Sequence, residues 1–414
     1  MANKIPYTIG PDAIPALLDF CAERGLTRFT LIADRNTYGA LGQRVDEALR
    51  AEGADILPIL LEGDDIIADA RYVMQVMVAL DRVPRTFLAV GSGTLTDITR
   101  FVSHRSGAEF ISLPTAPSVD GYTSIGAPIV IDGVKVTIPC HGPLAVFADL
   151  PTLCAAPQPM LAAGVGDMLA KYTSTADWEL DYVLIDEKYD PAIAARMRAA
   201  AQACAQATDA IATGSAEGLR VLMDGLIESG LCMLDFGATL PASGGEHHIS
   251  HFLEMKLLQE GRHSILHGAK VGIGVLTTAR RFDALKRLSL AEVEARLKSA
   301  TRPEPADEIA TIRAAYGAIA DQVIAIQQPF LEMTDAGFED LKARILARWD
   351  DLEYIAAGVP GAAEFEHWIG STGGAVTPAQ LGLSDEEVAL AARCAHYLKP
   401  RVTINRLSLM LGIP

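Results

Sequence analysis

The first part of the chain alternates between short apolar runs and amphipathic stretches. Residues 29–33, 55–61 and 85–90 are apolar enough for buried strands. Between them, residues 44–52 and 68–80 repeat apolar positions at the three- and four-residue spacing of a helix. Because buried strands alternate with helices, the pattern predicts a parallel sheet with helices on both faces, a Rossmann-like α/β domain.

The strand pattern ends near residue 150. Before that point, residues 127–131 and 134–138 flank Asp132-Gly133, a dipeptide that favours a two-residue hairpin turn. We therefore expect an α/β N-terminal domain, residues 1–150, followed by an all-α C-terminal domain, residues 151–414. The predicted helices of the second part are 159–177, 192–213, 216–235, 247–260, 264–279, 291–299, 306–328, 338–349 and 385–397.

Composition narrows the classes of partner. A chain of 414 residues, of which 50% are hydrophobic, is long enough for two cores. Its formal net charge of −17 argues against nucleic acid and anionic membrane surfaces as partners. We find no N-terminal signal pattern and no stretch of about 18 uncharged apolar residues. The 6 cysteines lack CxxC spacing, so a cytoplasmic protein with reduced thiols and no membrane span is expected.

Polar segments follow several predicted strands, and in parallel sheets ligands bind beyond the carboxyl ends of strands. Asp34 could accept hydrogen bonds from ribose hydroxyls there, or it could serve only as a helix N-cap. Gly91-Ser92-Gly93 precedes a helix, which suits a phosphate group, although such a sequence is also an ordinary tight turn. The loop of residues 114–124 is rich in hydroxyl side chains that suit a polar ligand.

The stretch of residues 244–269 carries the clearest candidate chemistry, because it holds five of the 9 histidines. His247 and His251 are four residues apart, and so are His263 and His267. On helices each pair would share one face. Two such helices would present neutral imidazoles to one divalent metal ion, whereas a lone histidine is more often an ordinary surface or core residue.

Asp167 is the candidate carboxylate ligand. It lies in a helical pattern with two glycines, each of which costs about 1 kcal/mol relative to alanine and so suggests either close packing or room for another group near Asp167. A metal ion held by His247 and His267 would be the partner that a buried aspartate needs. Two imidazoles and one carboxylate would leave coordination positions open for a substrate. In the alternative, Asp167 faces solvent and pairs with Lys171.

Taken together, these motifs resemble the sn-glycerol-1-phosphate dehydrogenase family. The wider superfamily contains glycerol dehydrogenase, iron-containing alcohol dehydrogenases and dehydroquinate synthase, and the resemblance implies a dehydroquinate synthase-like architecture. Pro117 and Ala269 depart from the family's usual residues, and no motif is matched beyond about residue 280. The matching segments, in the family's order, are Gly-Ser-Gly-Thr-Leu-Thr-Asp97, Pro-Thr115-Ala-Pro-Ser-Val-Asp120-Gly-Tyr-Thr-Ser124, Gly-Asp167-Met-Leu-Ala-Lys-Tyr, Ser-Gly-Gly-Glu-His247-His-Ile-Ser-His251 and Leu-His267-Gly-Ala-Lys-Val-Gly.

The resemblance implies a metal-dependent, NAD(P)-linked interconversion of dihydroxyacetone phosphate and sn-glycerol 1-phosphate. Asp167, His247 and His267 would hold one zinc or nickel ion. Asp120, Asp167 and His251 would contact the substrate, and Asp120 and His251 would be catalytic, with His251 supplying the proton. NAD(H) or NADP(H) would be contacted by Asp34, Gly93, Thr94, Leu95, Thr96, Asp97, Thr115, Ala116, Pro117, Ser118 and Ser124.

The sequence leaves other functions open. A glycerol or other polyol dehydrogenase of the same superfamily would need no phosphate-binding side chain, a role for which Lys270 and Arg262 are candidates here. A dehydroquinate synthase-like lyase usually carries glutamate where Asp167 stands, and a non-catalytic nucleotide or metal sensor is a further alternative. We expect a homodimer, with His248 pointing away from the metal and His263 supporting the site or serving the fold.

Overall fold

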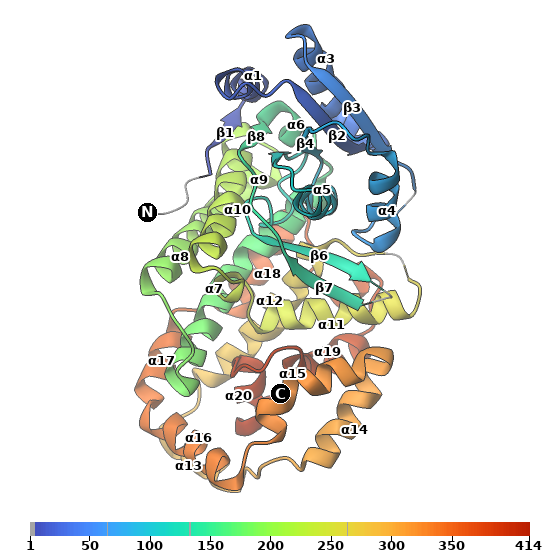
Figure 1. The fold of residues 1–414 in the computed structure, drawn as a ribbon. Coiled ribbons are helices and arrows are strands. Elements are labelled where there is room, and N and C mark those ends of the chain that lie inside the picture. The colour runs from blue at the N-terminus through green and yellow to red at the C-terminus, as the bar shows by residue number, and fades with distance from the viewer. Residues whose placement is uncertain (1–4, 64, 132–133, 263) are drawn as a thin grey trace. The chain divides into compact units, whose positions relative to one another are not determined.

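The structure is a computed structural model that describes the chain except residues 1–4, 64, 132–133 and 263 (Figure 1). The chain forms two compact units. Unit 1 comprises Met1–Met168, Gln202–Ala238 and Ser371–Gly373. The remainder, Leu169–Ala201, Thr239–Gly370 and Gly374–Pro414, forms unit 2.

A six-stranded parallel sheet forms the centre of unit 1, with the strand order β1-β8-β5-β4-β2-β3. The predicted strands at 29–33, 55–61 and 85–90 are confirmed as β2, β3 and β4. Strand β1 escaped prediction because it has four residues, of which the first two are not buried. The strands are β1 (Tyr7–Gly10), β2 (Arg28–Asp34), β3 (Asp55–Leu61), β4 (Thr86–Val90), β5 (Phe110–Leu113) and β8 (Val146–Asp149).

Apolar side chains cover both faces of this sheet. Successive strand residues point to opposite faces, so Leu31 of β2 joins one core cluster and Ile32 joins the other. Helices α1 (Ala13–Glu23) and α3 (Gln43–Ala51) supply the first cluster, and α4 (Ala70–Ala79) and α5 (Gly93–Arg105) supply the second. The predicted Rossmann-like α/β arrangement is therefore confirmed.

The strand order reverses beside β2, since β3 lies on one side of it and β4 on the other. From β4 the order continues through β5 to β8 and β1. Such a reversal leaves a crevice at the carboxyl ends of the strands, where doubly wound α/β folds bind their ligands. Asp34 ends β2 and Gly91 follows β4, so both candidate positions flank this point.

The predicted hairpin is present as an antiparallel pair, β6 (Gly126–Ile131) and β7 (Val134–Pro139). Its expected turn, Asp132-Gly133, lies outside the described residues. After β8 the chain is helical to its end, as predicted. The helices are α6 (Leu150–Cys154), α7 (Gln158–Ile185), α8 (Pro191–Gln206), α9 (Thr208–Ala212), α10 (Ala216–Phe236), α11 (Gly245–Gln259), α12 (His267–Leu285), α13 (Leu290–Ser299), α14 (Pro305–Tyr316), α15 (Ala320–Leu331), α16 (Asp335–Ala347), α17 (Trp349–Ala357), α18 (Ala362–Ser371), α19 (Asp385–Cys394) and α20 (Ile404–Leu411).

The helical part differs from the prediction in several places. The expected helix 306–328 is broken, because Gly317 adopts a φ of 53° and separates α14 from α15. The expected helix 264–279 begins later, at His267, and continues to Leu285. By length and composition alone, Pro305–Leu331 could cross a membrane, but in the structure its two halves, α14 and α15, contact each other.

Candidate active site

The loops that follow β4 and β5 lie side by side in unit 1. The Gly91 N–H donates to the Leu113 carbonyl at 3.1 Å, and the Thr115 N–H donates to the Gly91 carbonyl at 3.3 Å. A Cβ atom on Gly93 would lie 2.9 Å from a methyl group of Val119, so glycine there lets the second loop approach the start of α5. Two of the segments predicted to bind a dinucleotide are thus neighbours, next to a helix N-terminus that suits phosphate.

Arg100, which the sequence did not single out, ties α5 to the second loop. Its side chain is fully buried. Nη1 donates to Asp97 Oδ1 at 2.9 Å, and Nη2 donates to the carbonyls of Gly121 at 2.5 Å and Tyr122 at 3.2 Å. Asp97 therefore helps to orient the arginine that holds the loop.

The predicted dinucleotide-binding residues differ in exposure. The Leu95 side chain packs in the core beneath α5, so only its backbone can face a ligand. Gly93, Thr94 and Asp97 keep part of their surface exposed. The buried members of the set are Leu95, Thr96, Thr115, Ala116, Pro117, Ser118 and Ser124.

Asp34 caps a helix. Its Oδ1 accepts from the Thr37 N–H at 2.7 Å, and its own N–H donates to Thr37 Oγ1 at 3.0 Å. This reciprocal arrangement is a capping box at the start of α2 (Arg35–Thr37). The N-cap alternative considered from the sequence is therefore present, and contact between Asp34 and a ribose stays a prediction.

Asp167 lies on α7 and is fully buried, so the alternative in which it faces solvent is wrong. Its Oδ2 accepts from the Asp120 N–H at 3.0 Å. The Asp120 carboxylate in turn accepts from Ser229 Oγ at 2.8 Å. The close packing expected around Asp167 is confirmed, since a Cβ on Gly164 would lie 1.9 Å from the Pro117 carbonyl oxygen.

Three histidine rings lie together in unit 2. His247 and His251 are on α11, and His267 is the first residue of α12. The His247 ring centroid is 6.1 Å from that of His251 and 5.4 Å from that of His267, and those of His251 and His267 are 5.7 Å apart. His263, expected to pair with His267, lies outside the described residues.

A possible metal site can be named from these groups. Asp167, His247 and His267, the ligands predicted from the sequence, each offer one ligand atom of a type that can hold a metal ion. One carboxylate oxygen and two imidazole nitrogens form a donor set typical of zinc and other first-row divalent metals. The donor set therefore fits the expected cofactor.

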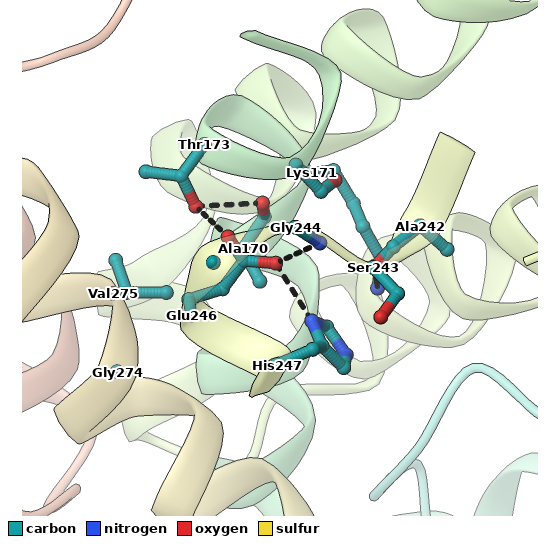
Figure 2. A network of polar contacts seen from close by, with 12 residues as sticks. Ala170, Lys171, Thr173, Ala242, Ser243, Gly244, Glu246, His247, Gly274 and Val275 are labelled. Carbon is teal, nitrogen blue, oxygen red and sulfur yellow. Dashed lines mark hydrogen bonds and ion pairs between the residues drawn. The ribbon is translucent and has the colours of Figure 1, made fainter. Parts of the chain in front are cut away.

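Glu246, which the sequence did not single out, orients one of these histidines (Figure 2). It is fully buried. Its Oε1 accepts from His247 Nδ1 at 2.7 Å and from the Gly244 N–H at 2.8 Å, and Oε2 accepts from Thr173 Oγ1 at 2.8 Å. Burial opposes ionisation, but these hydrogen bonds outweigh it and lower the pKa of Glu246. With Nδ1 held by a carboxylate, the Nε2 lone pair of His247 is available to a metal ion.

His248, the neighbour of His247, has a different environment. It is buried, and within the described parts of the chain neither ring nitrogen has a hydrogen-bond partner. Burial, with smaller effects of nearby cations, lowers the pKa of His248 well below its usual value, so the ring is neutral.

The two candidate phosphate ligands are engaged elsewhere. Lys270 is buried and donates to the Ile265 carbonyl at 2.6 Å. Arg262 pairs with Glu387 at 2.5 Å and Glu260 at 3.1 Å. Neither side chain therefore stands out as the group that would bind a substrate phosphate.

Comparison with known proteins gives the family. Residues 8–157 match the family model described as iron-containing alcohol dehydrogenase. The chain is 36% identical over 399 residues to glycerol-1-phosphate dehydrogenase [NAD(P)+] of Halalkalibacterium halodurans, covering 96% of this chain and 90% of that protein. It is 43% identical over 310 residues to the protein of the same name from Bacillus subtilis, covering 73% and 78%.

A solved structure supports the fold. Glycerol dehydrogenase of Schizosaccharomyces pombe matches with a TM-score of 0.64 at 16% identity, covering 98% of this chain and 88% of that one. At this identity the likeness concerns the fold alone. The identity to relatives that the chain covers over most of their length leads to one conclusion: the chain belongs to the glycerol-1-phosphate dehydrogenase family of the iron-containing alcohol dehydrogenase superfamily.

Proposed function

We propose that the protein is an NAD(P)-dependent oxidoreductase that interconverts dihydroxyacetone phosphate and sn-glycerol 1-phosphate. The observation that carries the proposal is identity over nearly the whole chain to proteins named glycerol-1-phosphate dehydrogenase [NAD(P)+]. A donor set of one aspartate and two histidines agrees with it, since an open metal site suits reduction of a ketone.

Asp167, His247 and His267 hold one divalent ion, zinc or nickel, in this proposal. When bound, the ion supplies a Lewis acid that polarises the substrate carbonyl. Glu246 fixes the tautomer and the orientation of His247, so the imidazole presents Nε2. The Asp120 N–H donates to the Asp167 carboxylate and so helps to orient it.

His251 is the proposed proton donor to the nascent alkoxide. It lies one helical turn from His247, and its ring centroid is 5.7 Å from that of His267. It therefore adjoins the proposed metal ligands without being one of them. Asp120 is proposed to contact a substrate hydroxyl, with its carboxylate oriented by Ser229.

The α/β part, residues 1–150, is proposed to bind the dinucleotide, which supplies the hydride. The N–H groups at the start of α5, with Gly93 and Thr94, would receive the pyrophosphate. Asp34 would accept from a ribose. The segment 115–118, with Ser124, would line the same site, while residues 151–414 would bind metal and substrate. We further propose a cytoplasmic homodimer.

The experiment is an assay of NADH and NADPH oxidation by the purified protein with dihydroxyacetone phosphate or dihydroxyacetone, with and without chelator. We expect turnover of the phosphorylated ketone, a kcat/KM for dihydroxyacetone lower by more than tenfold, and loss of activity on chelation. Preference for dihydroxyacetone would instead indicate a polyol dehydrogenase. Binding of dinucleotide without turnover of either ketone would favour a non-catalytic sensor.

A further inference from the structure

Unit 2 contains a cavity of about 660 Å³ whose lining residues include none of those proposed for the active site. Its walls come from α13, α14, α15, α16 and α20, which Figure 1 shows together. The volume lies within the roughly 300–1,000 Å³ that small-molecule sites occupy. Much of the wall is apolar, with side chains such as Phe330, Leu331, Phe338, Leu341 and Leu411.

A cation lies in this apolar wall. Arg406 of α20 lines the cavity and is partly accessible. Its guanidinium lies over the Phe330 ring, 3.6 Å from the centroid. Nε donates to the Arg401 carbonyl at 3.2 Å, and Nη2 donates to the Gln327 amide oxygen at 2.6 Å. Both acceptors are neutral, and no carboxylate of the described chain lies within ion-pair distance.

The other charged groups of the wall already have protein partners. Arg296 donates to the Leu411 carbonyl at 2.6 Å, and Arg302 pairs with Asp335 at 2.6 Å. The one acidic lining residue, Glu308, accepts from the Tyr397 hydroxyl at 2.8 Å. In the described chain Arg296 and Arg406 both lack a contacting carboxylate, and Arg406 is the one whose guanidinium lies against the apolar Phe330 ring. Burial lowers the pKa of Arg406 only to about 10, so it stays charged at neutral pH.

His396 gives a second sign that a ligand belongs here. It lines the cavity and is 4% exposed. Its Nδ1 is buried and has no hydrogen-bond partner in the part of the chain that the structure covers. Buried polar atoms are normally satisfied, and exceptions often mark the place of a missing partner.

We propose that this cavity binds an aliphatic carboxylate, with the carboxylate on Arg406 and the hydrocarbon chain along the apolar wall. A planar guanidinium matches a carboxylate in shape, and its charge is matched by a single negative charge. The apolar lining removes the chain from water. The proposal does not depend on the catalysed reaction, because it concerns a separate set of residues.

Calorimetric titration of the full-length protein with decanoate, below its micelle concentration, tests the proposal. Decanol serves as the uncharged probe of the same length, and acetate serves as the charged probe without a chain. We expect decanoate to bind with a micromolar Kd, at least tenfold more tightly than either other probe. Equal binding of decanoate and decanol, or no binding of decanoate below 1 mM, would overturn the proposal.

Variants locate the site. Arg406→Gln should weaken decanoate binding at least tenfold and leave decanol binding unchanged. Arg24→Gln is the matched control, because Arg24 also lies over a phenylalanine, 4.4 Å from the Phe20 centroid, but outside the cavity. If Arg406→Gln fails to fold, Leu341→Trp, which fills the apolar part of the cavity, replaces it and should likewise weaken decanoate binding at least tenfold. Unchanged decanoate affinity in either folded variant would contradict the assignment.

Discussion

At the scale of single residues, Glu246 is a buried carboxylate that contacts a proposed metal ligand, His247. It accepts from His247, Gly244 and Thr173 and has no exposed surface. In Glu246→Gln the amide cannot supply the charge that fixes His247 as an Nδ1–H tautomer. We expect metal affinity to fall by about 10–100-fold, as is typical when such a supporting carboxylate is removed. Competition with a fluorescent chelator measures it independently of activity.

Glu260→Gln is the control for that experiment. Glu260 directly follows the same helix, α11, and pairs with Lys256 and Arg262 at its exposed end. Its removal should leave metal affinity within about twofold of the wild type, since exposed ion pairs contribute little. If Glu246→Gln behaves like this control, the contact with His247 does not position a ligand.

Asp34 is the second residue whose role can be tested singly. A carboxylate at the end of β2 would repel the 2′-phosphate of NADPH at a cost on the order of 1–3 kcal/mol. NADH should then be preferred by roughly ten- to a hundredfold in kcat/KM. Asp34→Ser should narrow the ratio, and serine can still cap α2, so stability should change by less than about 1 kcal/mol.

Steady-state titrations of both dinucleotides at matched low ionic strength measure the ratio of the kcat/KM values for NADH and NADPH. A wild type without preference, or an unchanged ratio in the variant, would mean that Asp34 only caps its helix. In that case the capping box with Thr37 would by itself account for an aspartate at this position.

Residue types and spacing singled out the histidines and Asp167 as proposed ligands, because the residue types that hold metals are few and those at helical spacing share a helix face. Glu246 and Arg100 were missed for a physical reason. Each acts through contacts with other protein groups, Glu246 with Thr173 and Arg100 with the Gly121 carbonyl, that are distant in sequence. Spacing carries no information about such contacts until the fold is known.

At the scale of elements, the C-terminal helix α20 supports the start of the histidine helix α11. Asp177 Oδ2 accepts from the Gly245 N–H at 2.7 Å, and Oδ1 accepts from the Ile404 N–H at 2.6 Å. One carboxylate thus caps both helices. Asn405 adds a second link, since its amide donates to the Gly245 carbonyl at 3.0 Å and accepts from Arg281 at 2.7 Å.

Asn405→Ala should therefore affect both stability and the metal site. The change removes one buried hydrogen bond from the Arg281 guanidinium, which keeps its bonds to the Pro414 and Ala392 carbonyls, and one from the Gly245 carbonyl, at a cost of roughly 1–3 kcal/mol. Because Gly245 begins α11, we also expect metal affinity to fall several-fold. Chemical denaturation and chelator competition measure the two effects. Leu409 is 46% exposed on the same helix and provides the control. Leu409→Ala should leave metal affinity unchanged and alter the free energy of unfolding by less than about 1 kcal/mol.

Elements with regular periodicity were predicted well, and those defined by tertiary contacts were not. Strands β2 to β4 and helices α10 and α13 follow their apolar patterns closely. Helices α17, α18 and α20 are eight to ten residues long and were missed. Isolated helices of this length are marginal, so packing rather than local pattern decides them.

At the scale of the whole molecule, buried neutral histidines couple stability to pH. Burial lowers the pKa of His396 well below its usual value, as it does for His248. Below about pH 6.5 the unfolded chain binds protons that the folded chain does not, so the free energy of unfolding falls as pH falls. Each histidine contributes up to about 1.4 kcal/mol per pH unit.

We expect His396→Phe to reduce the dependence of the unfolding free energy on pH between pH 6 and pH 5. The reduction should correspond to close to one fewer proton taken up on unfolding, whatever the effect of the substitution on stability at pH 7. Urea denaturation at several pH values gives the slope. His367→Phe, the same substitution at an exposed position, is the comparison variant. Equal slopes in the wild type and His396→Phe would show that His396 is protonated in the fold.

Metal removal should also act on the stability of the whole molecule, because an ion that binds only the folded chain stabilises it by mass action. At a free metal concentration of a hundred times Kd, the contribution is about 2.7 kcal/mol. Chelation should therefore lower the Tm of the wild type by several degrees, and added zinc or nickel should restore it.

In His247→Ala we expect no bound metal and no chelator effect. His248→Ala is the matched neighbour: it should keep its metal and the full chelator-induced shift. Since His248 is buried, however, the truncation leaves a cavity, and its Tm should start lower than that of the wild type. Metal retained at full occupancy in His247→Ala, or a chelator effect lost in His248→Ala instead, would mean that the ligands of the ion have been assigned to the wrong face of α11.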